Sequence, residues 1–198
     1  MPVRKPPHND DQLELFSAIF TDVAGKDIRD TMELPFLNPS NRTRFKPIHY
    51  VSSSGVEVTV SGGEPYGIAN IFDYDLIVWL LSQIRHGLNR DEHVSRKIRF
   101  TRHAFLKDVR RNCGGRDYKN FAAAVARLKN TTITTSIRAK GKQTAMFSWL
   151  DYAKFFEDPR GRLQEVEVLI PEWLFEAVCN DTLVLSINSR LFPSYKRT

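Results

Sequence analysis

The sequence predicts an α+β fold, and three observations lead to that prediction. Apolar residues recur at helical spacing in three stretches, at residues 71–88, 101–109 and 116–129. Short β-branched runs between and after these stretches are typical of strands, for example residues 131–138. The chain of 198 residues, 41% hydrophobic and 26% charged, has the size and composition of one ordinary domain with a packed core.

Residues 1–30 are predicted to form a flexible N-terminal tail ahead of a domain at residues 31–190. The first eleven residues contain three prolines and end in Asn9-Asp10-Asp11. Apolar residues between positions 11 and 20 favour a short helix, and the polar residues 21–31 are expected to be a linker.

The first half of the domain alternates strands and helices. Residues 48–51 and 56–60 alternate apolar and polar positions around Ser-Ser-Ser-Gly, which predicts a hairpin. Residues 71–88 are apolar over most of a helical surface, so this helix is expected to be central and buried. A strand follows at 96–100, and Thr101 is a suitable N-cap for the next helix. Asn112-Cys-Gly-Gly then predicts a turn that ends this helix.

The second half begins with the clearest helix, at residues 116–129, whose core stripe is expected to be Tyr118, Phe121, Ala122, Val125 and Leu128. A β-ribbon follows at 131–138 and 143–150, with a turn at Ala139-Lys-Gly-Lys. A strand at 163–170, a short helix from Pro171 to Val178 and a strand at 183–187 complete the domain. The order helix, strand, helix, turn, helix, ribbon predicts a winged helix-turn-helix domain with a β-hairpin wing.

The positive charge is concentrated on this predicted motif. Residues 96–142 hold 14 Lys and Arg against two acids, a net charge of +12, whereas the whole chain carries +6. Such a field attracts a polyanion, and cations with Asn on the groove-facing side of a helix match phosphates and base edges. Ala123 and Ala124 would let the helix backbone approach DNA closely. The candidate DNA-binding residues are Arg110, Arg111, Arg116, Lys119, Asn120, Arg127, Asn130, Arg138, Lys140 and Lys142.

Other functional classes have little support. The five histidines form no HxH or HExxH pair, and the paired glycines fit no nucleotide-binding motif, so we expect no metal, no cofactor and no enzymatic activity. The chain has no secretory signal and no apolar run near the roughly 20 residues that span a bilayer. Its two cysteines lie far apart, as expected for reduced thiols in a cytoplasmic protein.

A short motif in the tail points to a protein partner. Gln12-Leu13-Glu14-Leu15-Phe16 resembles the peptides by which bacterial replication proteins bind the DNA polymerase sliding clamp, with Glu14 in place of the usual Ser or Asp. Gln12, Leu13, Leu15 and Phe16 are the candidate clamp-binding residues. The alternative is the short helix, packed on the domain through Leu15, Phe16 and Ile19.

Five stretches between residues 31 and 190 resemble the plasmid-encoded replication initiator protein A family of bacteria, and they occur in the family's order. They are Met32-Glu-Leu-Pro-Phe-Leu-Asn-Pro-Ser, Ile71-Phe-Asp-Tyr-Asp-Leu-Ile, Gly114-Gly-Arg-Asp-Tyr, Leu128-Lys-Asn-Thr-Thr-Ile and Pro171-Glu-Trp-Leu. The resemblance implies a winged-helix initiator that binds repeated origin DNA, forms homodimers and recruits a host initiator or helicase.

The resemblance also implies a second winged helix beyond Tyr195-Lys-Arg, so residues 191–198 are expected to begin a linker or a truncated second domain. Two alternatives to an initiator stay open. A transcriptional repressor would use the same domain at an operator and would not need residues 1–30. A dimerisation module with only non-specific DNA contacts would keep its DNA affinity when the cations of the 116–129 helix are neutralised.

Overall fold

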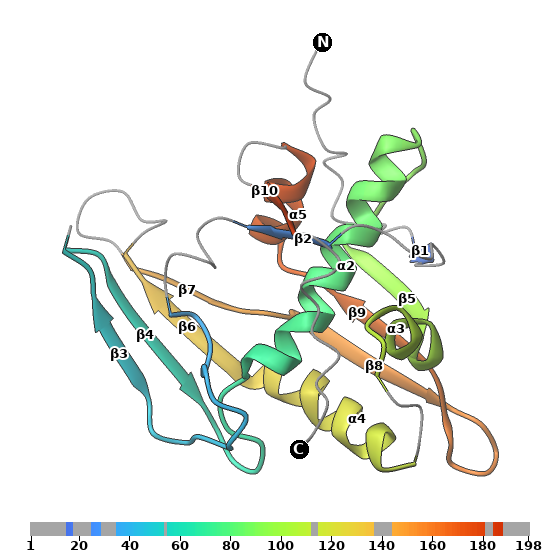
Figure 1. Cartoon of the computed structure of the whole chain (residues 1–198), viewed down its shortest axis with the longest axis horizontal. Coiled ribbons are helices and arrows are strands. Elements are labelled where there is room, and N and C mark those ends of the chain that lie inside the picture. The colour runs from blue at the N-terminus through green and yellow to red at the C-terminus, as the bar shows by residue number, and fades with distance from the viewer. Residues whose placement is uncertain are drawn as a thin grey trace.

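The computed structural model describes residues 15–17, 25–28, 35–53, 55–111, 115–136, 144–180 and 184–187. They form a mixed α/β structure in which helix α2 (Ile71–Asn89) lies between two four-stranded sheets (Figure 1). One sheet has the strand order β3-β4-β6-β7, and the other has the order β1-β5-β9-β8. A third, two-stranded pair joins β10 to β2.

The first sheet is antiparallel throughout. It consists of β3 (Ile48–Val51), β4 (Glu57–Gly62), β6 (Thr131–Thr135) and β7 (Ala145–Ser148). The predicted hairpin of β3 and β4 is confirmed, and so is the ribbon of β6 and β7. The ribbon is not an isolated wing, because β6 also pairs with β4 over five residues.

The second sheet contains β1 (Leu15–Ser17), β5 (Lys97–Thr101), β9 (Leu163–Leu169) and β8 (Tyr152–Glu157). Three of its strands are antiparallel neighbours, and β1 joins the edge of β5 in parallel. The chain passes from the first sheet to the second between β7 and β8. Trp149 and Leu150 are fully buried at this passage, and Trp149 makes edge contacts with the rings of Phe36 and Tyr74.

The helices agree with the predicted positions. Helix α2 buries residues around most of its circumference, including Leu76, Ile77 and Leu80, which confirms that it is central. Helix α3 (Arg102–Asp108) is capped by the Thr101 side chain, which accepts a hydrogen bond from the amide of Ala104. Helix α4 (Gly115–Asn130) packs on α2, β7 and β8, and α5 (Glu172–Cys179) packs on α2.

The predicted N-terminal organisation is wrong in two places. Leu15–Ser17 is strand β1 rather than part of a helix, because the open edge of β5 supplies the hydrogen bonds that its backbone needs. Within the predicted linker, β2 (Gly25–Ile28) pairs with β10 (Val184–Ile187). Residues 1–30 are therefore not a uniformly flexible tail.

Residues 152–157, for which the sequence pattern predicts no element, form β8 against β9.

A buried carboxylate lies on β9, although sheet positions of this kind are normally apolar. Glu167 is 4% exposed, and its carboxylate forms ion pairs with two cations of β5, Arg99 (Nη2 at 2.8 Å) and Lys97 (Nζ at 3.3 Å). Burial raises the pKa of Glu167, but the hydrogen bonds from Arg99 and Lys97 lower it by more, so the net pKa lies below its ordinary value. The charged form therefore stabilises the pairing of β5 with β9.

We expect Glu167→Gln to lower the free energy of unfolding at pH 7 by about 1–3 kcal/mol, because it leaves two cations without their carboxylate. Since the folded pKa is depressed, the stability from Glu167 is present above the ordinary value of 4.5 and is lost as pH falls below it. The difference from wild type, measured by urea denaturation, should shrink from pH 7 to pH 3. The matched control is Glu165→Gln on the same strand. A difference that is constant with pH would contradict this account.

Candidate nucleic-acid interface

Helix α4 has one buried side and one exposed side. Phe121, Val125 and Leu128 are buried in the core, as their spacing predicts. Lys119, Asn120, Lys129 and Asn130 are exposed. The exposed side thus presents two cations and two amide side chains, which match the donors that read phosphates and base edges.

The two alanines of α4 that are predicted to let the helix approach DNA closely differ in exposure. Ala124 is buried, and Ala123 is partly buried. The prediction that Ala124 faces DNA is wrong, because its position lies beside the core residues Phe121 and Val125 on the helix. The small side chain instead permits close packing of α4 on the domain.

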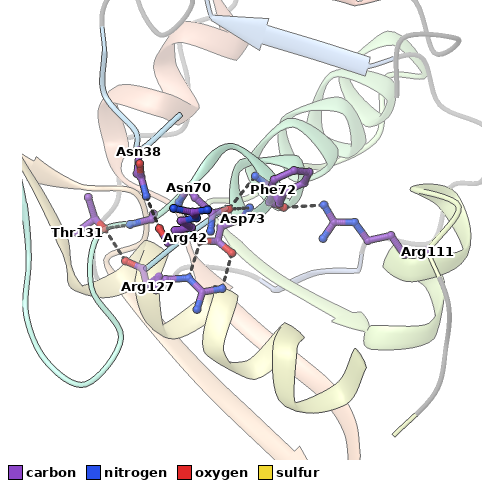
Figure 2. Close-up of polar contacts among 9 residues, drawn as sticks. Asn38, Arg42, Asn70, Phe72, Asp73, Arg111, Arg127 and Thr131 are labelled. Carbon is purple, nitrogen blue, oxygen red and sulfur yellow. Dashed lines mark hydrogen bonds and ion pairs between the residues drawn. The ribbon is translucent and has the colours of Figure 1, made fainter. Parts of the chain in front are cut away.

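The Arg127 side chain is partly buried and binds α2 instead of extending into solvent. Its Nε and Nη2 donate to the two carboxylate oxygens of Asp73 at 2.7 Å each (Figure 2). The side chain of Asp73 is 3% exposed, and that of Arg127 is 19% exposed. The hydrogen bond to Asp73 raises the pKa of Arg127, although burial opposes it. The predicted exposed position of Arg127 is therefore wrong, and the guanidinium joins α4 to α2.

The same carboxylate caps α2. Asp73 Oδ2 accepts the amide of Asn70 at 2.9 Å, and Asn70 Oδ1 accepts the amides of Phe72 and Asp73 in return. Thr131, the first residue after α4, accepts the amide of Ala69 at 2.7 Å. The start of α2 and the end of α4 are consequently held as one unit (Figure 2).

Arg111 also binds the first turns of α2. Its Nη2 donates to the carbonyl of Phe72 at 2.8 Å and to the carboxylate of Asp75. Burial raises the pKa of Asp75, and the charge of Arg111 partly offsets this. Arg110 is exposed and has a φ of 55°, so the chain already turns sharply there, before the turn predicted at residues 112–115. Residues 112–114 of that predicted turn lie outside the described part, and Gly115 begins α4.

The other predicted DNA contacts are located only in part. Arg116 lies in the first turn of α4. Arg138, Lys140 and Lys142 lie outside the described residues, between the ends of β6 and β7. A further exposed group, Arg42, Phe45 and Lys46, is not among the predicted contacts. The alternation of basic and aromatic residues in Arg42-Thr-Arg-Phe-Lys46 is the signal that could have identified it.

Only the second half of the clamp-like peptide belongs to the described part of the chain, where it forms the edge strand of the second sheet. Gln12 and Leu13 lie outside the described residues, whereas Leu15 and Phe16 belong to β1 and pair with Lys97 and Ile98 of β5. The short helix, which was the alternative for this segment, is excluded at residues 15–17. Extended backbone is the conformation that binding of such a peptide in a groove requires.

Within the described ranges, no three His, Cys, Asp or Glu side chains converge in a way that suits a metal ion. In the same part of the chain, no helix has the length and apolar character of a membrane span. Cys179 is a free thiol, and burial raises its pKa to about 11. A thiol with a raised pKa is a poor nucleophile.

The chain matches the family model described as Replication initiator protein A over residues 26–197. It is 35% identical over 135 residues to a putative replication protein of Wigglesworthia glossinidia brevipalpis. That alignment covers 66% of this chain and 49% of the other protein, so the chain spans about half the length of this relative.

Two solved structures share the fold. A crystal structure of SeMet derivatives of domain 2 and domain 3 of RctB aligns with a TM-score of 0.57 at 12% identity, covering 73% of this chain and 59% of that chain. Another crystal structure, of RctB domains 2–3, aligns with a TM-score of 0.55 at 11% identity, covering 72% and 56%. At these identities the likeness shows the fold alone.

We expect Arg127→Ala to lower the free energy of unfolding by about 3 kcal/mol, because it leaves the buried carboxylate of Asp73 without its cation. Lys119→Ala, on the exposed side of the same helix, should change it by less than about 0.5 kcal/mol. Both values are measured by chemical denaturation. An Arg127→Ala variant with wild-type stability but weaker DNA binding would reverse the role given to Arg127 here.

Proposed function

This chain belongs to the replication initiator protein A family, and we propose that it initiates plasmid replication by binding repeated origin DNA through a winged helix. In this proposal α4 enters the major groove, α3 lies behind it and the ribbon of β6 and β7 follows the adjacent backbone. The protein works in the cytoplasm by binding and recruitment, without covalent chemistry or a cofactor.

The exposed side of α4 is the observation that carries the proposal. Lys119, Asn120 and Asn130 are exposed, and the buried stripe of Phe121, Val125 and Leu128 fixes the rotation of the helix about its axis. Asn pairs with adenine in the major groove, and Lys donates to guanine or to phosphate. The arrangement therefore supports both base reading and backbone contact by one helix.

Two arginines of the predicted contact set have a positioning role in the proposal. Arg127 and Arg111 bind the first turns of α2 on both sides of Phe72 and so orient α4 and the end of α3 on the domain. A helix that reads bases benefits from such rigid support, because a small displacement misaligns every hydrogen bond. Arg116 and the ribbon cations Arg138, Lys140 and Lys142 remain part of the proposed contact surface.

The proposed partners are a second copy of the chain, the polymerase sliding clamp and a host initiator or helicase. Clamp binding would use Gln12, Leu13, Leu15 and Phe16. Since Leu15 and Phe16 pair with β5 in the free chain, clamp binding requires β1 to leave the sheet. The peptide is then held in one of two places, the domain or the clamp.

The DNA proposal predicts that Lys119→Ala/Asn120→Ala abolishes the preference for origin repeats. Binding is measured by fluorescence anisotropy on a duplex with the repeats and on a scrambled duplex, over a range of salt concentrations. Removal of each good hydrogen-bonded pair between a side chain and a base should reduce discrimination by about 1–3 kcal/mol. The control with the same change of charge is Arg90→Ala, exposed just beyond the far end of α2. Equal, weak binding of wild type to both duplexes would refute base reading by this domain.

The clamp proposal predicts that Gln12→Ala/Leu13→Ala removes binding to the host sliding clamp and leaves duplex binding unchanged. These two residues precede β1, so the pairing of β1 with β5 is retained. The measurement is surface plasmon resonance with immobilised clamp, and the control is Asn9→Ala/Asp10→Ala. Undiminished clamp affinity in the Gln12/Leu13 variant would rule out this peptide as the contact.

A further inference from the structure

A basic and aromatic segment lies far in sequence from the +12 stretch. Residues 42–47 precede β3, and Arg42, Phe45 and Lys46 are all exposed. Phe45 is 46% exposed and lies between Arg42 and Lys46 in the sequence. No ion pair found among the described residues involves Arg42 or Lys46. The segment thus presents an apolar ring between cations that are available to an anion.

The main chain of this segment is held by hydrogen bonds from both sides. Asn38 Nδ2 donates to the carbonyl of Arg42 at 2.7 Å, and the amide of Ile68 donates to the carbonyl of Arg44 at 2.8 Å. The Arg44 guanidinium donates to the carbonyl of Lys46 at 2.9 Å. Arg44 therefore shapes the segment, whereas the Arg42 and Lys46 side chains are not needed for its conformation.

Gly67 makes the close approach to this segment possible. Its φ is 77°, and a Cβ at this position would lie 2.8 Å from the Arg44 carbonyl oxygen. Only glycine meets both conditions without strain. The segment is consequently a defined surface rather than a loosely tethered loop.

The segment lies beside the end of the proposed recognition helix. The amide of Asn38 donates to the carbonyl of Ala69 at 2.9 Å, and the amide of Ala69 donates to Thr131, the residue that follows α4. Figure 2 shows Asn38 with its hydrogen bond to Arg42 and, nearer to α4, Thr131 and Arg127. Lys129 and Asn130, both exposed, directly precede Thr131, so these hydrogen bonds connect the segment to the exposed end of α4. Glu64, an acid, is exposed on the loop that carries Gly67.

We propose that residues 42–47 form a second contact with the duplex that α4 engages, with Arg42 and Lys46 neutralising backbone phosphates and Phe45 packing on the adjoining deoxyribose. This inference rests on the proposed function, since it extends the DNA surface of α4 beyond the groove. Contacts to phosphate and sugar position a protein on DNA but carry no sequence information directly.

The test compares wild type with Arg42→Ala/Lys46→Ala on the repeat duplex and the scrambled duplex, again as a function of salt. Without these two phosphate-binding cations, the negative slope of log K against log [salt] should become shallower by about 1.8, and binding to both duplexes should weaken by a similar factor. The repeat preference should be retained. Phe45→Ala should weaken binding about tenfold or less without changing the slope. The control with the same change of charge is Arg160→Ala/Arg162→Ala, on the exposed turn between β8 and β9.

The outcomes separate this inference from the proposed function. An unchanged slope in the Arg42/Lys46 variant, or an equal weakening in the control, overturns the second contact. If wild type has no repeat preference and the slope still becomes shallower in the Arg42/Lys46 variant, base reading by α4 is overturned but the second contact is supported. A wild type that binds no duplex overturns both. Thermal unfolding of each variant verifies that the fold is retained.

Discussion

The carboxylate of Asp73 is the point on which the arrangement of the helices depends. It closes the capping box of α2 through the amide of Asn70, and it receives both donors of the Arg127 guanidinium from α4. A buried charge is tolerated only when it is paired and hydrogen-bonded, and Asp73 meets both requirements in one contact. The helix start also favours negative charge, so Asp73 and Asp75 suit the first turns of α2 in any case. The bidentate hydrogen bond from Arg127 also constrains the orientation of α4 relative to α2, because two parallel hydrogen bonds restrict the angle between the groups as well as their distance.

The helices and most strands could be predicted because their signals are local. The spacing of Phe121, Val125 and Leu128 identifies both α4 and its buried side, and Thr101 is correctly identified as the cap of α3. The exposure of Lys119 and Asn120 follows from the same spacing. Helical periodicity indicates a direction for each residue but no partner. Arg127 is 54 residues from Asp73 in the sequence, and Arg111 is 36 residues from Asp75. Each of these arginines, predicted to contact DNA, instead pairs with a carboxylate of α2 that helical spacing could not identify.

The missed features depend on pairing between distant segments. Nothing in Gly25-Lys-Asp-Ile28 indicates a strand until its partner, β10 near the other end of the chain, lies beside it. The cations at positions 42–46 escape notice when charge is counted by stretches of sequence, because the residues outside 96–142 are acidic on balance. The fold brings them to the end of α4 through Ala69 and Thr131. Surface charge is therefore better assessed by neighbours in space than by neighbours in sequence.

The two short N-terminal strands affect how a shortened chain would behave. Strand β1 occupies the edge of β5, and β2 is the partner of β10. A chain that starts after residue 30 lacks both strands and exposes the backbone donors and acceptors of β5 and β10 to solvent. Open edges of this kind recruit strands from other molecules and promote aggregation. Loss of activity after such a deletion would then reflect aggregation through the exposed strand edges as much as the loss of the clamp-like peptide.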